Sequence, residues 1–366
     1  MNRQRRAVLA SLGTAMLFGV VAAAAPARAA AIRCDDTVGA AVSTELGIHR
    51  PPRLDRPTVV DTAFRIVELT DIDVRKGHFQ FQAYVDFAWC DRRLTFDPKE
   101  MGSELRAFVG ADALKKQGEI WSPDLAMVNE VSGIQVRKRE LTIRSDGRVR
   151  LRGLFSAHLA ANFDLRRFPF DSQILPIQVE SFAWSEDTVT FRTIPEGIGV
   201  RQDFELAEWR VGDVTSEMMS VARAMGDKSF ARLEIHIAIE RRAGFYLWKA
   251  VLPLFLIVGL SWTVFWIPDG LSGRIRLSAT VILTIVAYQF AMAADLPKVA
   301  YVTLFSAFTT VSFVSVALTV LVNIIVFYRQ DQGSETAVSR SDRVSRWLVP
   351  VIYLLSVAAV AMFYLG

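Results

Sequence analysis

The chain is poor in cysteine, the residue whose disulfides cross-link many small exported proteins. It has two cysteines in 366 residues, Cys34 and Cys90, which is too few for a disulfide framework. A single bond between them is possible in an oxidising compartment. Because Cys34 falls in an N-terminal stretch that we expect to be loose, the redox state of this pair stays open at the level of sequence.

Patterns that bind metals or carry out catalysis are also missing. The four histidines, His49, His78, His158 and His236, show no metal-ligand spacing. The sequence contains no G-x-S-x-G motif, no phosphate-binding glycine loop and no cysteine–histidine pairing that suggests a nucleophile. We therefore expect no metal, no cofactor and no enzymatic activity.

Charge of one sign is not in large excess. The chain has 42 Lys and Arg against 38 Asp and Glu, a net charge of +4. Much of the surplus comes from the first few residues and from loops beside apolar segments, which is typical of membrane topology rather than of nucleic-acid binding. We expect no nucleic-acid partner.

What the chain has in plenty is apolar side chains, which make up 52% of its residues. Residues 1–29 combine a basic start, the apolar run Ala7 to Ala25 and the small-residue site Ala27 to Ala29, a pattern typical of a secretory signal peptide. Residues 30–59, which hold several prolines among charges, are interpreted as a lead-in. The next domain therefore lies outside the cytoplasm.

Residues 60–242 carry a strand pattern. Apolar and polar residues alternate from Phe79 to Trp89 and again from Leu233 to Ile239, as in strands with one buried face. Further short apolar runs lie at Glu140–Ile143, Val149–Leu154, Ile174–Val179 and Thr188–Phe191. Turn signals such as Ser145 to Gly147 separate them. Many short strands predict an all-β, immunoglobulin-like sandwich.

Residues 243–366 change character abruptly. Four apolar segments are long enough to cross a bilayer, at about 245–267, 274–294, 300–327 and 347–365. The polar loop before the last segment, Tyr328 to Arg346, and the start of the second segment are both rich in arginine. Because positive loops stay in the cytoplasm, these two ends lie on the side opposite the exported sandwich.

The second apolar segment is polar along one face. At helical spacing its residues share a stripe that runs from charge through a hydroxyl to apolar side chains: Arg276, Thr280, Leu283, Ala287, Phe290 and Ala294. A helix that lines a narrow aqueous path has this character, with a hydrophobic constriction that closes by dewetting. The alternative is a bundle helix whose arginines only mark its cytoplasmic end.

Short motifs identify a family that this architecture resembles. They are W-x-D-x-R-L at Trp89–Leu94, I-W-x-P-D at Ile120–Asp124, the loop Phe163–Gln173, Glu180–Phe182, Arg241 before the first span, and Leu296–Lys298 after the second. Their order resembles that of the pentameric ligand-gated ion channels, the Cys-loop receptor superfamily. The two cysteines that name the superfamily would fall at Ala161 and Leu175, so the resemblance is to its bacterial branch, which lacks that disulfide.

The resemblance implies a homopentamer in a bacterial inner membrane, with the sandwich in the periplasm and four-helix domains around a pore. It also implies that a gating signal passes through residues at the boundary of the two domains: Phe168, Pro169, Asp171, Arg241, Pro297 and Lys298. Pro169 between two aromatic residues suits a rigid turn, in which the peptide bond before the proline can be cis. The alternative is that Asp164, Asp171 and Arg241 only satisfy backbone groups and solvent.

The start of the second span bears on ion selectivity. Relatives that conduct cations usually carry a glutamate there, whereas this chain has Gly273, and no acidic residue lies between Asp269 and Asp295. Five copies of Arg276 around a pore would favour anions as the permeant ions. Arg276 turned toward lipid headgroups is one alternative. A ring too crowded to conduct is another, and it would make the protein a non-conducting periplasmic sensor.

The resemblance also implies a ligand site between neighbouring sandwiches, often lined by aromatic residues that hold an ammonium group. The matching positions are Tyr84, Asp86, Asn129, Glu130, Phe182, Trp184 and Phe230. These residues suit a small amine, but Val128 stands where an aromatic residue is common, and the loop Glu217 to Phe230 is basic. An acid ligand, protons or no ligand therefore remain alternatives, and Phe182 and Phe230 are equally suited to a core.

Overall fold

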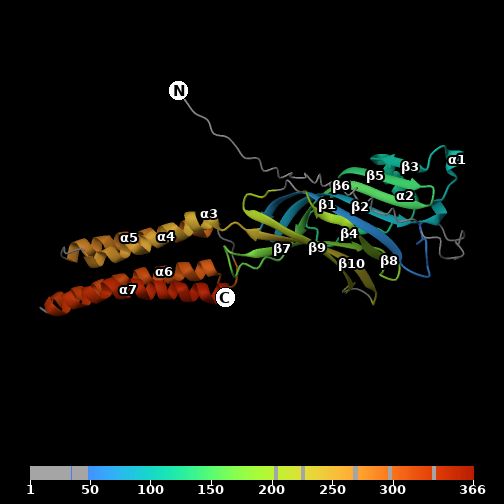
Figure 1. The fold of residues 1–366 in the computed structure, drawn as a ribbon. Helices are drawn as coiled ribbons and strands as arrows, with labels where there is room; N and C mark the ends of the chain where they lie inside the picture. The colour runs from blue at the N-terminus through green and yellow to red at the C-terminus, as the bar shows by residue number, and fades with distance from the viewer. Residues whose placement is uncertain are drawn as a thin grey trace, which may run out of the picture.

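The computed structural model describes residue 34 and residues 48–201, 205–223, 227–266, 271–295, 299–331 and 335–366. It consists of a β-sandwich followed by four long apolar helices, which lie to one side of the sandwich (Figure 1). This is the predicted fold class. The predicted signal peptide, most of the lead-in, Pro297 and Lys298 lie outside the described residues.

The larger sheet has six strands in the order β3-β5-β6-β2-β1-β8. The strands span β1 (Thr58–Asp73), β2 (His78–Cys90), β3 (Leu105–Val109), β5 (Gln135–Arg144), β6 (Arg148–Ala160) and β8 (Val189–Val200). All neighbours are antiparallel except β1 and β8. On β2 the predicted alternation holds, since Phe79, Phe81 and Val85 are buried while Tyr84 is exposed.

The smaller sheet has four strands in the order β4-β7-β10-β9. These strands span β4 (Leu125–Met127), β7 (Ser172–Ser181), β9 (Trp209–Ala222) and β10 (Ser229–Arg241). The stretch Glu217 to Phe230, interpreted from sequence as a loop, is therefore strand at both ends. Backbone pairing of Glu217–Ala222 with β10 explains this difference, because hydrogen bonds rather than an alternating apolar pattern hold this edge strand.

The motifs of the sandwich hold its core and turns. Trp89 packs edge-on to Trp121 with ring centroids 6.3 Å apart, and both are buried. Asp91, fully buried, accepts two hydrogen bonds of 2.8 Å from the Arg93 guanidinium. At Gly147, which has φ +81°, a Cβ would lie 2.7 Å from the Asp91 carbonyl oxygen, so the β5–β6 turn needs glycine there.

Cys34 and Cys90 form a disulfide that joins the start of the chain to the end of β2. Cys34 is buried, so the expected loose position of this residue is wrong. The bond links residues 56 positions apart in the sequence. It therefore fastens Cys34 to the sandwich.

The helical domain begins with a composite helix made of α3 (Gly244–Tyr246), the π-helical η2 (Leu247–Val251), α4 (Leu252–Trp262) and the 3₁₀ turn η3 (Thr263–Trp266). It continues with α5 (Leu271–Asp295), α6 (Leu304–Asp331) and α7 (Glu335–Leu365). The candidate membrane spans are Gly244–Trp266, Gly273–Ala293, Leu304–Val326 and Arg343–Leu365. Helix α7 starts well before the predicted last span, because it is one continuous helix from Glu335 whose polar first turns precede the apolar part that hydropathy detects.

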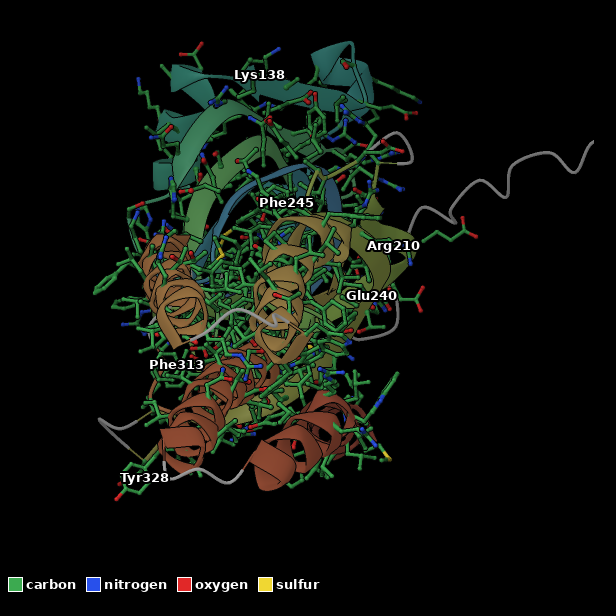
Figure 2. The ribbon with its side chains drawn as sticks, turned by 90° about the vertical axis from the view of Figure 1, so that its left-hand side faces the viewer. Lys138, Arg210, Glu240, Phe245, Phe313 and Tyr328 are labelled. Carbon is green, nitrogen blue, oxygen red and sulfur yellow. A yellow bond between two sulfur atoms is a disulfide. The ribbon has the colours of Figure 1, made fainter. Side chains whose placement is uncertain are left out.

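Chain direction places the two ends of the bundle. Helix α4 leaves the sandwich, α5 returns to it, and the C-terminus lies back at the junction (Figure 1). Arg276 and the start of α7 therefore lie at the end away from the sandwich. Seen from that end, Phe313 and Tyr328 of α6 stand at the outer margin of the bundle, where they are 37% and 65% exposed (Figure 2).

Candidate functional site

The junction between the domains is built around the loop between β6 and β7. The Leu304 amide donates to the Arg166 carbonyl oxygen at 2.8 Å, and the Tyr301 hydroxyl accepts from the Leu165 amide at 2.9 Å. Leu165, Phe168, Ala250 and Phe305 form one buried apolar cluster. The loop therefore contacts the top of the first span and the start of α6 directly.

Arg241 and Asp171 form a buried ion pair at this junction. The Arg241 Nε donates to Asp171 Oδ1 at 2.8 Å and its Nη2 donates to Oδ2 at 3.2 Å. The two side chains are only 4% and 1% exposed. Gln173 adds a third donor at 2.7 Å and also donates to the Asp164 carbonyl oxygen. The carboxylate therefore ties β7 to the last residue of β10.

Aromatic rings enclose the Arg241 guanidinium. Its central carbon lies 4.1 Å from the Trp209 ring centroid, 5.0 Å from that of Phe168 and 5.7 Å from that of Tyr246. Phe168 stands edge-on to Tyr246, with centroids 4.7 Å apart, and its peptide bond to Pro169 is cis. Such contacts stabilise a cation that burial would otherwise penalise. Four predicted coupling residues therefore meet in one place: Phe168, Pro169, Asp171 and Arg241.

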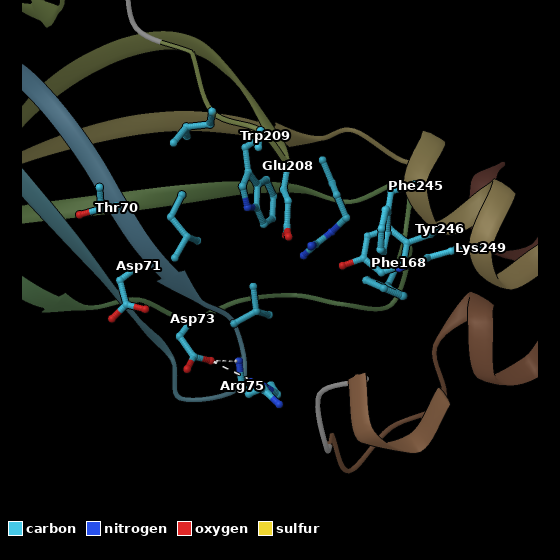
Figure 3. Close-up of a pocket in the computed structure, with 15 residues that line it drawn as sticks. Thr70, Asp71, Asp73, Arg75, Phe168, Glu208, Trp209, Phe245, Tyr246 and Lys249 are labelled. Carbon is cyan, nitrogen blue, oxygen red and sulfur yellow. Dashed lines mark hydrogen bonds and ion pairs between the residues drawn. The ribbon is translucent and has the colours of Figure 1, made fainter. Parts of the chain in front are cut away.

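A cavity of about 700 Å³ opens beside this ion pair (Figure 3). It is lined by the turn between β1 and β2 (Asp73, Val74 and Arg75), by Glu208 and Trp209, and by Tyr246 and Lys249 of the first span. Asp73 organises the turn by accepting from the amides of Arg75 and Lys76 at 2.9 and 3.1 Å. Burial raises the pKa of Asp73, but these bonds and the Lys76 ammonium outweigh it and lower the pKa below 3.8.

Helix α5 presents the predicted pore stripe on its unburied side. The exposed side chains on this stripe are Arg276, Thr280, Leu283, Ala287 and Phe290. Ser278, Val281 and Ile285 are buried. At about 100° per residue, the buried positions lie roughly opposite the stripe. The side chain of Ala294 lies outside the described set. One chain thus leaves the stripe from Arg276 to Phe290 without cover.

Two of the predicted ligand residues meet around an arginine that the motifs did not single out. The Arg223 guanidinium carbon lies 3.7 Å from the centroid of the Phe230 ring and 5.5 Å from that of Phe182. Arg223 also donates to the Glu180 carboxylate at 3.0 Å and to the Phe182 carbonyl oxygen at 2.7 Å. Phe182 is 68% exposed and is not a core residue. The aromatic pair already holds a cation.

The neighbouring predicted residues have structural partners. The Trp184 indole N–H donates to the Ser122 carbonyl oxygen at 3.2 Å, and its ring lies 6.2 Å from that of Trp121. The Asn129 amide donates to the carbonyl oxygens of Ala160 and Pro176. Glu130 is exposed and pairs with β6 through a single bridge. Trp184 and Asn129 therefore hold neighbouring backbone segments, while Glu130 is accessible.

Tyr84 and Asp86 lie on β2, in the other sheet. Asp86 accepts from the Arg150 Nε at 2.7 Å and from the Arg152 guanidinium at 3.4 Å. Its carboxylate raises the Arg150 pKa further, so the guanidinium stays charged at all ordinary pH values. Tyr84 is 51% exposed. Among the described residues, no hydrogen bond, ion pair or ring contact joins these two to the aromatic pair around Arg223.

Sequence reasoning missed the charged row that continues from Arg223. Glu180, 1% exposed, also binds Arg232, and Glu234 contacts both Arg232 and His236. The signal was available, because Arg232, Glu234 and His236 alternate with apolar residues and must share one face of β10. Glu180, the partner of Arg232, lies on the adjacent strand β7, which linear spacing does not reveal.

Comparison with known proteins agrees with this geometry. The sequence-family model for the neurotransmitter-gated ion-channel ligand-binding domain matches residues 47–243. The family model for the neurotransmitter-gated ion-channel transmembrane region matches residues 250–349. A proton-gated ion channel of Gloeobacter violaceus is 25% identical over 86% of this chain and 86% of its own length.

Animal receptors are similar as well. The gamma-aminobutyric acid receptor subunit beta-4 of Gallus gallus is 27% identical over 81% of this chain, and the beta subunit of Caenorhabditis elegans is 25% identical over 70%. These matches span 61% and 46% of those longer subunits. The two family models together cover most of the residues from the first strand to the last span. The chain therefore belongs to the neurotransmitter-gated ion channels, the Cys-loop receptor superfamily, which are channels and not enzymes.

Proposed function

We propose that the protein is a homopentameric ligand-gated channel with a pore lined by α5. The observation that carries the proposal is the stripe from Arg276 to Phe290, exposed on the side of α5 opposite its buried residues. An isolated chain would leave Leu283 and Phe290 71% and 76% exposed. Neighbouring copies around an axis would enclose these side chains, and a narrow apolar ring can close to water.

The membrane position follows from the same arrangement. The arginine-rich ends of α5 and α7 lie away from the sandwich, which supports a bacterial inner membrane with the sandwich in the periplasm. Membrane lipid would contact the exposed apolar residues of α6 and α7. The buried Arg241–Asp171 pair and the Phe168 cluster supply the contact through which a ligand that prefers the open arrangement would shift the pore.

Cysteine modification tests the pore. Both native cysteines are in a disulfide, so a cysteine introduced at Leu283 would be the reactive thiol. Leu283→Cys is expected to lose current on treatment with a charged thiol reagent, because the adduct enters the ion path. Leu318→Cys on α6, a leucine that is 46% exposed in the protomer, is the matched control and should keep its current. Equal behaviour of the two variants would contradict a pore on this face, and so would a detergent-extracted monomer.

We further propose that the permeant ions are anions. Arg276 lies on the stripe at the cytoplasmic end, and α5 carries no acidic residue before Asp295 in its described length. A ring of guanidinium groups attracts anions and repels cations, more strongly where water is scarce. Cation permeation would contradict this selectivity while leaving the pore intact.

We propose a small carboxylic acid as the ligand rather than an amine. The place of an ammonium group between Phe182 and Phe230 is taken by Arg223, and Asp86 is paired with Arg150. Lys228, exposed at the same loop, adds positive charge. An acid would meet cationic donors on arrival, whereas an amine would meet repulsion.

The ligand class is tested with matched probes. Succinate is expected to change the current of the wild-type channel and butylamine is not. Arg223→Gln should abolish the response to succinate, while Arg210→Ala, which removes an exposed arginine paired with Glu240, should preserve it. A response to butylamine alone would restore the amine interpretation. A response only to acid pH, unchanged by Arg223→Gln, would favour protons.

A further inference from the structure

Three potential metal ligands meet at the junction end of the larger sheet. They are Asp71 at the end of β1, His78 at the start of β2 and His158 near the end of β6. One ligand atom from each lies within 4.8 Å of the other two. The His78 Nε2 is 3.4 Å from Asp71 Oδ2, and the two imidazole rings are 5.9 Å apart. Linear spacing hides this group because each member comes from a different strand.

The register of the sheet brings the two histidines together. His78 is opposite Ala160 and Gln80 is opposite His158, so the histidines are diagonal neighbours on one face. A bulge between Thr70 and Asp73 then shifts the end of β1 relative to β2. Asp71 lies in this bulge with φ 47°, a conformation uncommon outside glycine. Bulges re-aim side chains, and this one directs a carboxylate at His78.

The geometry points to a binding site for a divalent transition-metal ion such as Zn²⁺, held by Asp71, His78 and His158. Zinc binds imidazole nitrogen and carboxylate oxygen at about 2.0–2.2 Å, which places two tetrahedral ligands roughly 3.4 Å apart. The His78–Asp71 pair has that separation already. His158 offers a ring nitrogen within 4.8 Å of the ligand atoms of both other residues. Three protein ligands leave a fourth position for water, and two imidazoles favour zinc-like ions over calcium or magnesium.

A second group, Glu217, Glu234 and His236, also fits the distances but not the chemistry. Glu234 already accepts from Gln178 at 2.7 Å and contacts Arg232. With one imidazole and a neighbouring guanidinium, this group is better explained as part of the charged row on β10. It serves as the internal control for the site at Asp71.

The site stands beside the turn that contacts the membrane domain. Residues 74–77 lie between Asp71 and His78 in the sequence, and Val74 packs against the cluster of Leu165, Phe168 and Phe305. A metal bound across β1, β2 and β6 would restrain this turn. We therefore infer that Zn²⁺ alters gating, a consequence that rests on the proposed channel function, whereas metal binding itself does not.

Calorimetric titration of ZnCl₂ into the full-length protein in detergent tests the site without any current. Wild type should bind Zn²⁺ reversibly, and His158→Ala should weaken the affinity by more than about 10-fold, since even indirect supports of a metal are worth that much. Asp71→Asn, an isosteric change at an exposed residue, should do the same and guards against misfolding of the histidine variant. His236→Ala should match wild type.

Unchanged affinity in both His158→Ala and Asp71→Asn would overturn the site, and so would loss of binding only in His236→Ala. Currents then test the regulatory step. Micromolar Zn²⁺ should change the current of wild type and not of Asp71→Asn. Binding with identical currents in both proteins would overturn regulation while leaving the site, and a silent channel that still binds Zn²⁺ would count against the proposed function alone.

Discussion

Leu233 of β10 is fully buried within one chain, whereas Leu283 of α5 is 71% exposed. The difference extends to the domains around them. The sandwich packs its large apolar side chains into a closed core, and its buried charges have partners, such as Asp91 with Arg93. The helices bury one side of α5 and leave the other open. A single chain thus completes the core of the sandwich, whereas one side of α5 stays uncovered.

The largest expected loss of stability is at the boundary between the two domains, where Arg241 and Asp171 form a buried ion pair. Arg241→Ala leaves the buried Asp171 carboxylate without its cation and should lower the free energy of unfolding by about 3–5 kcal/mol. Chemical denaturation measures this. The double variant Arg241→Met with Asp171→Leu should recover part of the loss, and a double variant no better than the single one would contradict the account.

The next effect sharpens the comparison of the two leucines directly. Leu233→Ala should cost about 2–5 kcal/mol, because it leaves a cavity in a packed core. Leu283→Ala should change the unfolding free energy by less than about 0.5 kcal/mol per chain, as for other surface positions. Its effect should instead be a leak current, because the apolar ring would be wider. Similar stability losses for both variants would break the comparison.

A somewhat smaller effect is expected at the disulfide. Cys34→Ser with Cys90→Ser removes a cross-link between residues 56 positions apart. Loss of such a bond costs about 2–4 kcal/mol. Thermal unfolding of the sandwich should shift downward in this double variant, and reductant should reproduce the shift in wild type only. A reductant effect that persists in the double variant would assign the stabilisation to something else.

The smallest effect is expected at Asp73. Because its pKa is lowered below 3.8 in the folded protein, its contribution to the β1–β2 turn is present at higher pH and fades only as pH falls through that lowered value. Between pH 7 and 5 its charge does not change. Asp73→Asn should therefore leave the midpoint of any pH response in this range unmoved, as recorded from currents during pH steps.

Sequence patterns were most informative where burial is one-sided. The alternation from Phe79 to Trp89 predicted β2, and apolar length predicted the four spans. The sequence pattern did not predict strand β9, because β9 is an edge strand with mostly exposed residues that is held by pairing with β10. The start of α7 was not predicted either, because hydropathy alone predicts a loop for its charged residues.

The candidate sites divide in the same way. The stripe on α5 and the Arg241 region could be predicted, because they follow helical spacing or a motif. The partner of Arg223 could not, since Glu180 lies 43 residues earlier in the sequence and meets it only after β7 and β9 have both paired with β10. The group of Asp71, His78 and His158 depends on a bulge and a register that no linear spacing encodes.

The central claim is that Arg276 faces an anion pore. The most direct measurement is the reversal potential of purified protein in a planar bilayer under a chloride gradient, for wild type, Arg276→Ala and Arg343→Ala. Arg343, exposed near the same end of the bundle on α7, is the matched control. We expect a reversal potential near that of chloride in wild type and Arg343→Ala, and a clear shift in Arg276→Ala. A cation reversal potential in wild type, or identical values in all three proteins, would contradict the claim.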